Sequence, residues 1–290
     1  MFAEPRAVRV VGQTMLKDLL LYVSPDDVYA AHPATRHAIE LAGAYAAHLT
    51  AVILEITVEA PVTFYRGGAL PDLDSVRDSH HAVARQQAET FSGAAERAGI
   101  GFAIQHARSY AGDAGQTVAA RARLHDLTIL PAVRGEPQDG LRIVEDCLFS
   151  SGRPVLLVPE TSEGTQAKGV VIAWDGTAPA VRATKDAMPF LADAARVTVI
   201  TIAEESTTRV GSSGKDLCAH LGRHGIEATF RDFNMHGRSV GESIADAARE
   251  LDADLLVMGG FAHSRLRDLV LGGATRHILS ATSMPVLLSH

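Results

Sequence analysis

Short apolar runs recur along the chain, and a longer segment with helical periodicity separates each run from the next. In the first half the runs cover residues 17–23, 51–56, 100–107, 125–130 and 154–158. In the second half they cover residues 168–174, 197–202, 226–233, 254–258 and 285–288. Runs this short, rich in aliphatic and β-branched residues, are typical of strands buried on both faces. Their alternation with helical segments predicts a parallel sheet with helices on both sides.

The two halves also resemble each other in sequence. The phrases ERAGI and GRHGI precede the third run of each half, HDLTIL matches ADLLVM, and RPVLLVP matches MPVLLSH with Pro154 and Pro285 at equal places. Two copies of one unit are the economical explanation. We therefore predict an α/β fold of two tandem Rossmann-like domains, each a five-stranded, parallel, doubly wound sheet.

A polar stretch without apolar periodicity, ETSEGTQA at residues 160–167, separates the copies and places the domains at 1–164 and 165–290. Residues 60–79 carry several glycines and prolines, which predicts a surface loop. A helix is expected over residues 80–98, with His80 and His81 at its start on a solvated face.

Composition narrows the class of protein. The 290 residues are 47% apolar, enough for two cores, while a net charge of -7 and 5% aromatic residues argue against a nucleic-acid partner. Neither a basic leader nor an apolar run of about 18 residues occurs, so we expect a soluble, cytoplasmic protein without membrane contact. Cys147 and Cys218, without a CxxC pair, are expected to be reduced and structural.

A candidate site for an anion follows the run at 254–258. Gly259 and Gly260 end that run, a polar and basic loop follows, and Gly272 and Gly273 open the next helix. The free N–H groups of a helix's first turn attract anions, and glycines allow a close approach to the backbone. The pattern therefore predicts a phosphate-binding turn in the second half.

This turn resembles the nucleotide-binding signature of the universal stress protein family, GxxGx9G followed by Ser or Thr. Here the pattern reads Gly259, two residues, Ala262, nine residues and Gly272. The chain departs from it in two places, because Ala262 replaces the second glycine and Gly273 replaces the hydroxyl residue, although Thr275 follows. The resemblance implies an adenine nucleotide alpha hydrolase-like fold, and the departures imply weakened but retained phosphate binding.

The resemblance also implies the other ligand contacts. Asp175 would lie beside an adenine, with Ile202 and Met258 against the base, and His263 or Arg265 would reach the terminal phosphates. The implied cofactor is ATP or a related adenine nucleotide, with Mg²⁺ if the phosphates are retained. The implied set is Ala173, Asp175, Ile202, Met258, Gly259, Ala262, His263, Arg265, Gly272, Gly273, Ala274 and Thr275. From the residues alone, Asp175 equally fits a turn or helix cap, and Arg265 fits a solvated loop.

The first half lacks this signature. Pro131, which has no backbone N–H, stands where Gly259 stands, and Ser24 occupies the place of Asp175, with Asp26 and Asp27 nearby. We therefore expect a structural partner and one nucleotide site per chain. The runs at 154–158 and 285–288 are candidates for the contact within this intramolecular pseudo-dimer; a homodimer and a downstream protein partner remain possible.

No catalytic or metal residues are predicted. Walker A, GxSxG and HExxH motifs are absent, and His220 and His224, four residues apart, lack a third ligand. Ser239 is expected to cap a helix that ends near Leu251. The leading hypothesis is a nucleotide-binding sensor or switch in a stress response. A slow ATPase or phosphotransferase using His263 or Asp175, and a nucleotide-free interaction module, are the alternatives.

Overall fold

The computed structural model describes residues 16–23, 33–57, 73–132, 138–162, 167–203, 213–235, 237–260 and 273–290. Within these ranges the strands are β1 (Asp18–Val23), β2 (His48–Thr57), β3 (Phe102–Tyr110), β4 (Leu127–Pro131), β5 (Val155–Val158), β6 (Gly169–Ala173), β7 (Arg196–Ala203), β8 (Ala228–Asn234), β9 (Leu255–Gly259) and β10 (Val286–Ser289). The α-helices are α1 (Pro33–Tyr45), α2 (Leu73–Ala98), α3 (Ala114–Ala122), α4 (Gln138–Ser150), α5 (Ala178–Asp186), α6 (Met188–Asp193), α7 (Gly214–Arg223), α8 (Val240–Glu250) and α9 (Gly273–Ala281).

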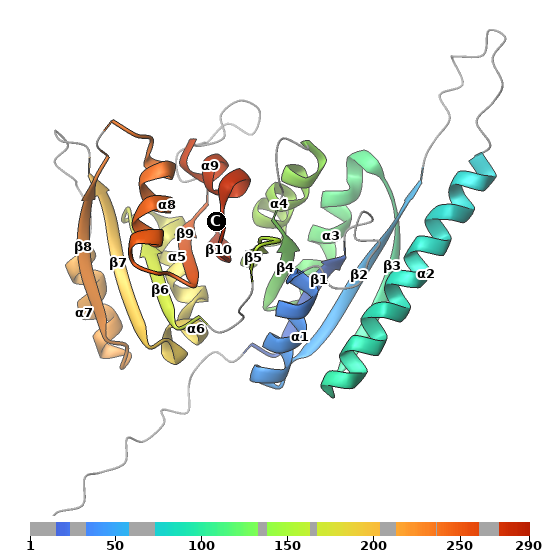
Figure 1. Cartoon of the computed structure of the whole chain (residues 1–290), viewed down its shortest axis with the longest axis horizontal. Coiled ribbons are helices and arrows are strands. Elements are labelled where there is room, and N and C mark those ends of the chain that lie inside the picture. The colour runs from blue at the N-terminus through green and yellow to red at the C-terminus, as the bar shows by residue number, and fades with distance from the viewer. Residues whose placement is uncertain are drawn as a thin grey trace, which may run out of the picture.

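The strands form one continuous sheet in the order β3-β2-β1-β4-β5-β10-β9-β6-β7-β8. Strands β1 to β5 pair in parallel, and so do β6 to β10, with the same strand order on either side of the middle. The predicted α/β class with two five-stranded parallel sheets is confirmed. The structure adds that the two sheets meet edge to edge, side by side, as Figure 1 shows.

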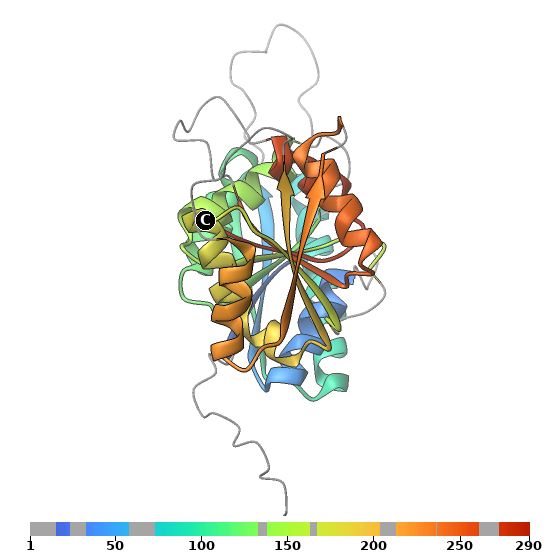
Figure 2. The ribbon, with the colours of Figure 1, turned by 90° about the vertical axis from the view of Figure 1, so that its left-hand side faces the viewer.

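Helices cover both faces of the sheet. Helices α1, α2, α5, α6 and α7 pack on one face and share a single hydrophobic cluster with the strands. Helices α3, α4, α8 and α9 pack on the other face around a second cluster. The strands fan about a common centre in the end view of Figure 2, which is the usual handed twist carried across a wide sheet.

The two halves are joined by antiparallel pairing of β5 with β10. Val286 lies opposite Leu157, Leu287 opposite Leu156 and Leu288 opposite Val155. All six side chains are at most 2% exposed. The predicted contact between the last strands of the two halves is therefore confirmed, and it is a continuation of the sheet.

A second contact between the halves joins α1 to α6. The Tyr45 hydroxyl donates to Asp193 Oδ2 at 3.1 Å, and the Tyr45 ring meets Phe190 edge to face with the ring centres 6.2 Å apart. Burial, followed by the negative charge of Asp193, raises the pKa of Tyr45, so this hydroxyl stays a donor at neutral pH. The halves therefore touch along one helical layer as well as along the sheet.

Two helices of the second half begin with reciprocal caps. Ser239 caps α8: its hydroxyl accepts from the Glu242 N–H, and the Glu242 carboxylate accepts from the Ser239 N–H. These hydrogen bonds lower the pKa of Glu242. Helix α8 ends at the C-cap Leu251, so the predicted boundaries of this helix are confirmed. Ser213 and Asp216 form the same arrangement at the start of α7.

The prediction of a surface loop over residues 60–79 is wrong for residues 73–79. Helix α2 already begins at Leu73, because residues 73–79 contain neither glycine nor proline to prevent it. His80 and His81 are partly exposed: His80 Nδ1 lies 3.2 Å from the Ile56 carbonyl oxygen, and His81, whose side chain is 43% exposed, faces β2. The predicted domain boundary between 164 and 165 falls outside the described residues.

Both cysteines lie in the described part of the chain. Cys147 is buried and Cys218 is half-buried, and neither is in a disulfide. Burial raises the pKa of the Cys147 thiol to about 12, which leaves it protonated and unreactive.

In the described ranges, no helix is both long and apolar enough to cross a membrane.

The seam between β5 and β10 is expected to dominate stability. Leu156→Ala removes a side chain that is 2% exposed and leaves a cavity at the join, so we expect a loss of about 2–5 kcal/mol in the free energy of unfolding. Urea denaturation followed by circular dichroism measures this loss. Leu124→Ala, at a position 84% exposed, is the matched control and should change stability by less than about 0.5 kcal/mol. Equal effects of the two substitutions would contradict the assigned importance of the seam.

Candidate functional site

The candidate site lies in the second half, at the point where the order of the strands in the sheet reverses. Strand β6 sits between β9 and β7, with Ala173 paired to Met258 on one side and to Ile200 on the other. The chain leaves β6 towards α5 on one face of the sheet, whereas the helix that follows β9, α9, covers the other face. The carboxyl ends of parallel strands at such a switch point form the usual ligand crevice of open α/β sheets.

The structure brings several predicted residues to this edge. Ala173, Met258 and Gly259 lie at the adjacent ends of β6 and β9, and Ile202 lies near the end of β7. Ala173 and Ile202 are partly buried against the cluster under α8 and α9, whereas Met258 is a member of that cluster and 4% exposed. Ala173 and Ile202 therefore offer apolar surface at the crevice, while Met258 chiefly fills the core.

Asp175 stabilises the turn before α5, which is one of the two roles that its Asp-Gly-Thr sequence predicted. Its Oδ1 accepts from the N–H and the hydroxyl of Thr177, at 3.0 and 2.6 Å. Thr177 in turn is the N-cap of α5. Asp175 itself is exposed, and among the described residues its second carboxylate oxygen has no hydrogen-bond partner. The side chain thus fixes the start of α5 and still presents an oxygen to solvent beside the crevice.

Gly259 is required by packing at the end of β9. A Cβ atom built on it would lie 2.6 Å from the Ala180 backbone nitrogen and 2.8 Å from the Pro179 carbonyl carbon, both in the first turn of α5. Real Cβ atoms do not approach backbone this closely, so any side chain here would push α5 away from the sheet. One glycine of the motif therefore has a structural reason to be glycine, independent of any ligand.

Gly260 links the crevice to the first half of the chain. The Gly260 N–H donates to the Ser289 carbonyl oxygen at 2.8 Å, and His290 Nδ1 lies 3.0 Å from the Gly260 carbonyl oxygen. A Cβ atom on Gly260 would meet Leu148 Cδ2 of α4 at 2.6 Å, and the His290 ring packs on Phe149 of α4 with the ring centres 4.6 Å apart. The residue at which the loop after β9 begins is therefore held by contacts from both halves.

Beside Gly259, the last strand is bonded to a half-buried acid at the end of α5. Ser289 is paired with Gly259 in the sheet, and its hydroxyl donates to Asp186 Oδ2 at 2.8 Å. Burial raises the pKa of Asp186, although the Ser289 hydrogen bond and nearby basic groups oppose the shift. This bond ties the end of α5 to the end of β10, on the side of the sheet away from α9.

The start of α9 is open at its first residue. Gly273 is exposed, and nothing lies within 4 Å of where its Cβ would be. Ala274 packs against Gly241 of α8, whose own Cβ would meet the Ala274 carbonyl oxygen at 2.8 Å. Thr275 is 4% exposed, so its side chain points into the protein. The N–H groups of the first turn are the surface that α9 offers to a ligand.

The remaining predicted contacts, Ala262, His263, Arg265 and Gly272, lie outside the described residues. In the first half, Pro131 is paired with Val158 as Gly259 is with Ser289, and the Ala132 N–H donates to the Val158 carbonyl oxygen as Gly260 does to Ser289. Pro131 therefore does stand in the place of Gly259. Ser24, Asp26 and Asp27 are not among the described residues.

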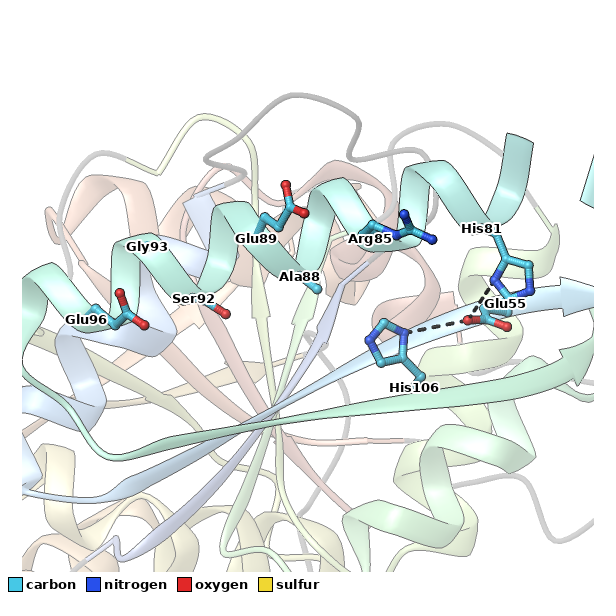
Figure 3. Close-up of a pocket in the computed structure, with 9 residues that line it drawn as sticks. All are labelled: Glu55, His81, Arg85, Ala88, Glu89, Ser92, Gly93, Glu96 and His106. Atoms are coloured by element: carbon cyan, nitrogen blue, oxygen red, sulfur yellow. Dashed lines mark ion pairs between the residues drawn. The ribbon is translucent and has the colours of Figure 1, made fainter. Parts of the chain in front are cut away.

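A separate cavity of about 550 Å³ lies in the first half between α2 and strands β2 and β3, and the sequence reading missed it. Figure 3 shows His81 and His106 on either side of Glu55, with Arg85 above them on α2. His81 Nδ1 lies 3.3 Å from the Glu55 carboxylate, and His106 Nδ1 lies 3.7 Å from it. The one signal in the sequence was an acid inside the apolar run AVILEI.

Glu55 is in contact with three nitrogen-bearing side chains beside this cavity. The Glu55 side chain is 17% exposed and is also 3.5 Å from Arg108 Nε. Both imidazoles contact the same carboxylate oxygen, Oε1, one from α2 and the other from β3, as the dashed lines in Figure 3 show. In the part of the chain that the structure describes, no group of three or more His, Cys, Asp and Glu side chains could hold a metal ion.

Comparison with known proteins identifies the second half. Residues 167–290 match the model of the universal stress protein family, so this part of the chain belongs to that family. Among curated proteins, no sequence matches significantly.

Solved structures extend the likeness to the whole fold. A universal stress protein from Archaeoglobus fulgidus DSM 4304 has 18% identity and a TM-score of 0.68, with 93% of this chain and 97% of that chain covered. A functionally unknown protein from Pseudomonas aeruginosa PAO1 has 15% identity and a TM-score of 0.58, with 94% and 92% covered. At these identities the likeness establishes the fold alone. It includes the first half, so the chain as a whole has a universal stress protein fold.

Gly259 at the end of β9 and Gly273 at the start of α9 should respond differently to alanine. Gly259→Ala forces backbone of α5 to move, and we expect it to cost about 1–3 kcal/mol in the free energy of unfolding. Gly273→Ala meets open space in a helix and should change stability by less than about 1 kcal/mol. Urea denaturation of both variants distinguishes them, and equal losses would show that the packing around Gly259 is not what requires glycine there.

Proposed function

We propose that the second half binds one adenine nucleotide per chain, with ATP or a related nucleotide as the ligand, and that the bound state acts as a sensor or switch in a stress response. The observation that carries the proposal is the pairing of Ala173 with Met258 at the switch point of a domain that belongs to the universal stress protein family. This pairing places the turn at Asp175 and the glycines after Met258 along one edge of the sheet.

The described residues fit such a ligand in three ways. The first turn of α9 presents backbone N–H groups at an exposed glycine, Gly273, which suits a phosphate or ribose hydroxyl. Ala173 and Ile202 offer partly exposed apolar surface for the flat base. Asp175 offers a carboxylate oxygen at the end of β6. In this proposal the residues of the loop, Ala262, His263, Arg265 and Gly272, complete the phosphate side.

A bound nucleotide triphosphate brings its own Mg²⁺ if the terminal phosphates are retained, and the chain need not supply a resident metal. Asp175 is the acidic group of the crevice that could contact such an ion or the ribose. Its Oδ1 is engaged in the turn before α5, so ligand contact would use the second oxygen.

Binding is favoured over hydrolysis on the same residues. An ATPase needs a group that positions water or an acceptor at the terminal phosphate. Asp175, which follows β6, is already committed to holding Thr177. The first half offers Pro131 in the place of Gly259, which removes one backbone donor, so we assign it no second site.

Blocking the start of α9 tests the site. Gly273→Val places a side chain in open space above the first turn, so the fold should be kept while the affinity for ATP falls at least about tenfold in calorimetric titration. Gly222→Val on α7 is the matched control, because that glycine is also helical, exposed and free of neighbours, and it should leave the affinity unchanged. Wild-type protein should bind one ATP per chain without steady phosphate release. No binding by the wild type would favour the nucleotide-free module.

Two substitutions separate the roles of Asp175. Asp175→Asn keeps an oxygen that can accept from Thr177, whereas Asp175→Ala removes the turn as well. If the carboxylate contacts the nucleotide, both variants lose affinity for ATP and only the alanine variant also loses about 0.5–1 kcal/mol of stability. Wild-type affinity in the asparagine variant would restrict Asp175 to its turn.

A further inference from the structure

The face of the second half that carries α5 and α7 contains a cavity that neither the motif nor the crevice explains. Helices α1 and α2 pack against each other on the first half, whereas α5 and α7 are separated by a space of about 400 Å³. Trp174, the residue that follows β6, lies at this cavity and is 7% exposed. Cavities that hold small organic ligands have volumes of roughly 300–1,000 Å³.

The walls of the cavity are apolar. Val181 on α5, Met188 at the start of α6 and Leu217 on α7 line it together with Trp174. Val181 is 52% exposed, although it lies on a helix whose inner positions are fully buried. When a flat or aliphatic group covers apolar surface of this kind, next to an indole, the free energy of the system falls.

The cavity is also lined by nitrogen-bearing side chains. Lys185 on α5 and the imidazoles of His220 and His224 on α7 line it, and the two imidazole rings meet edge to face with their centres 4.8 Å apart. The acid at the rim, Asp216, accepts hydrogen bonds from the N–H and hydroxyl of Ser213, which lower its pKa and occupy it at the start of α7. In the described part of the chain, no ion pair or hydrogen bond is formed by the Lys185 ammonium.

We propose that this cavity, between α5 and α7, binds a small amphipathic anion with a flat apolar body and a single carboxylate or sulfonate group. The body would cover Trp174, Val181 and Leu217, and the acidic group would lie at Lys185 and the two imidazoles. Lys185 and the two imidazoles are among the few polar groups of a largely apolar lining, and such a combination fixes the orientation of a ligand. The inference does not depend on the nucleotide site.

The chain provides its own reporter for this cavity, because Trp174 is the single tryptophan of the 290 residues. The probe is 8-anilinonaphthalene-1-sulfonate, an aromatic sulfonate whose emission rises in apolar surroundings. Its absorption overlaps the emission of tryptophan, so a dye bound nearby quenches the indole by energy transfer. Titration of the full chain should show saturable binding at one site, with quenching of Trp174 emission in step with the rise in dye emission.

The variants keep the fold and change the cavity. Val181→Glu puts a carboxylate in the apolar wall four residues before Lys185, where it also pairs with that ammonium and keeps the helix stable, so dye affinity should fall at least about tenfold. Lys185→Gln should lower it about three- to fivefold through loss of one exposed charge. Leu124→Glu, at an exposed position of the first half, is the matched control and should bind the dye as the wild type does.

Three results would overturn the inference. These are no binding of the dye, unchanged Trp174 emission on saturation, and binding of the dye by Val181→Glu as tight as by the control. An excess of ATP distinguishes this cavity from the crevice. Retained dye binding supports a separate site, whereas displacement by ATP that Gly273→Val abolishes would assign the dye to the nucleotide site and remove the basis for this one.

Discussion

Backbone pairing between β5 and β10 is the contact on which the rest of the molecule depends. Both strands carry apolar side chains on both faces, at most 2% exposed, so neither could stand at a sheet edge without exposing a strip of leucine and valine. Pairing them buries both strands and leaves β3 and β8 as the edges of the sheet. Both hydrophobic clusters run through the seam, because the strands and helices of the two halves contribute to each. Each half therefore completes the core of the other.

The same join determines how the crevice is built. Gly260 follows β9 directly and is contacted by Leu148 from α4 of the first half, while the terminal His290 bridges Gly260 to Phe149. Gly259, one residue earlier, is fixed from the other side by the first turn of α5. The beginning of the loop is thus clamped between a helix of its own half and a helix of the other. The first half therefore contacts the position where the proposed nucleotide site would begin.

The sequence was sufficient for elements that are set by local patterns. Apolar runs such as 197–202 become strands because burial on both faces demands them, and Ser239 begins α8 because its hydroxyl meets an N–H three residues on. Contacts between distant segments were out of reach. The motif marked Gly259, but the clash with Pro179 that requires it appears only once α5 lies on β9. Glu55 looked like an exception within an apolar run until β3 and α2 brought His106 and His81 beside it.

Covalent linkage of the halves gives the seam a property that two separate chains would lack. Strands on one polypeptide meet at a high effective concentration, so their pairing does not weaken on dilution as association between free subunits does. The contact of Leu148 with Gly260 then persists however scarce the protein is. Linkage also breaks the equivalence of the two copies: a residue such as Pro131 can occupy one crevice without appearing in the other. The asymmetry between the halves is therefore a freedom that a symmetric assembly of identical subunits could not have.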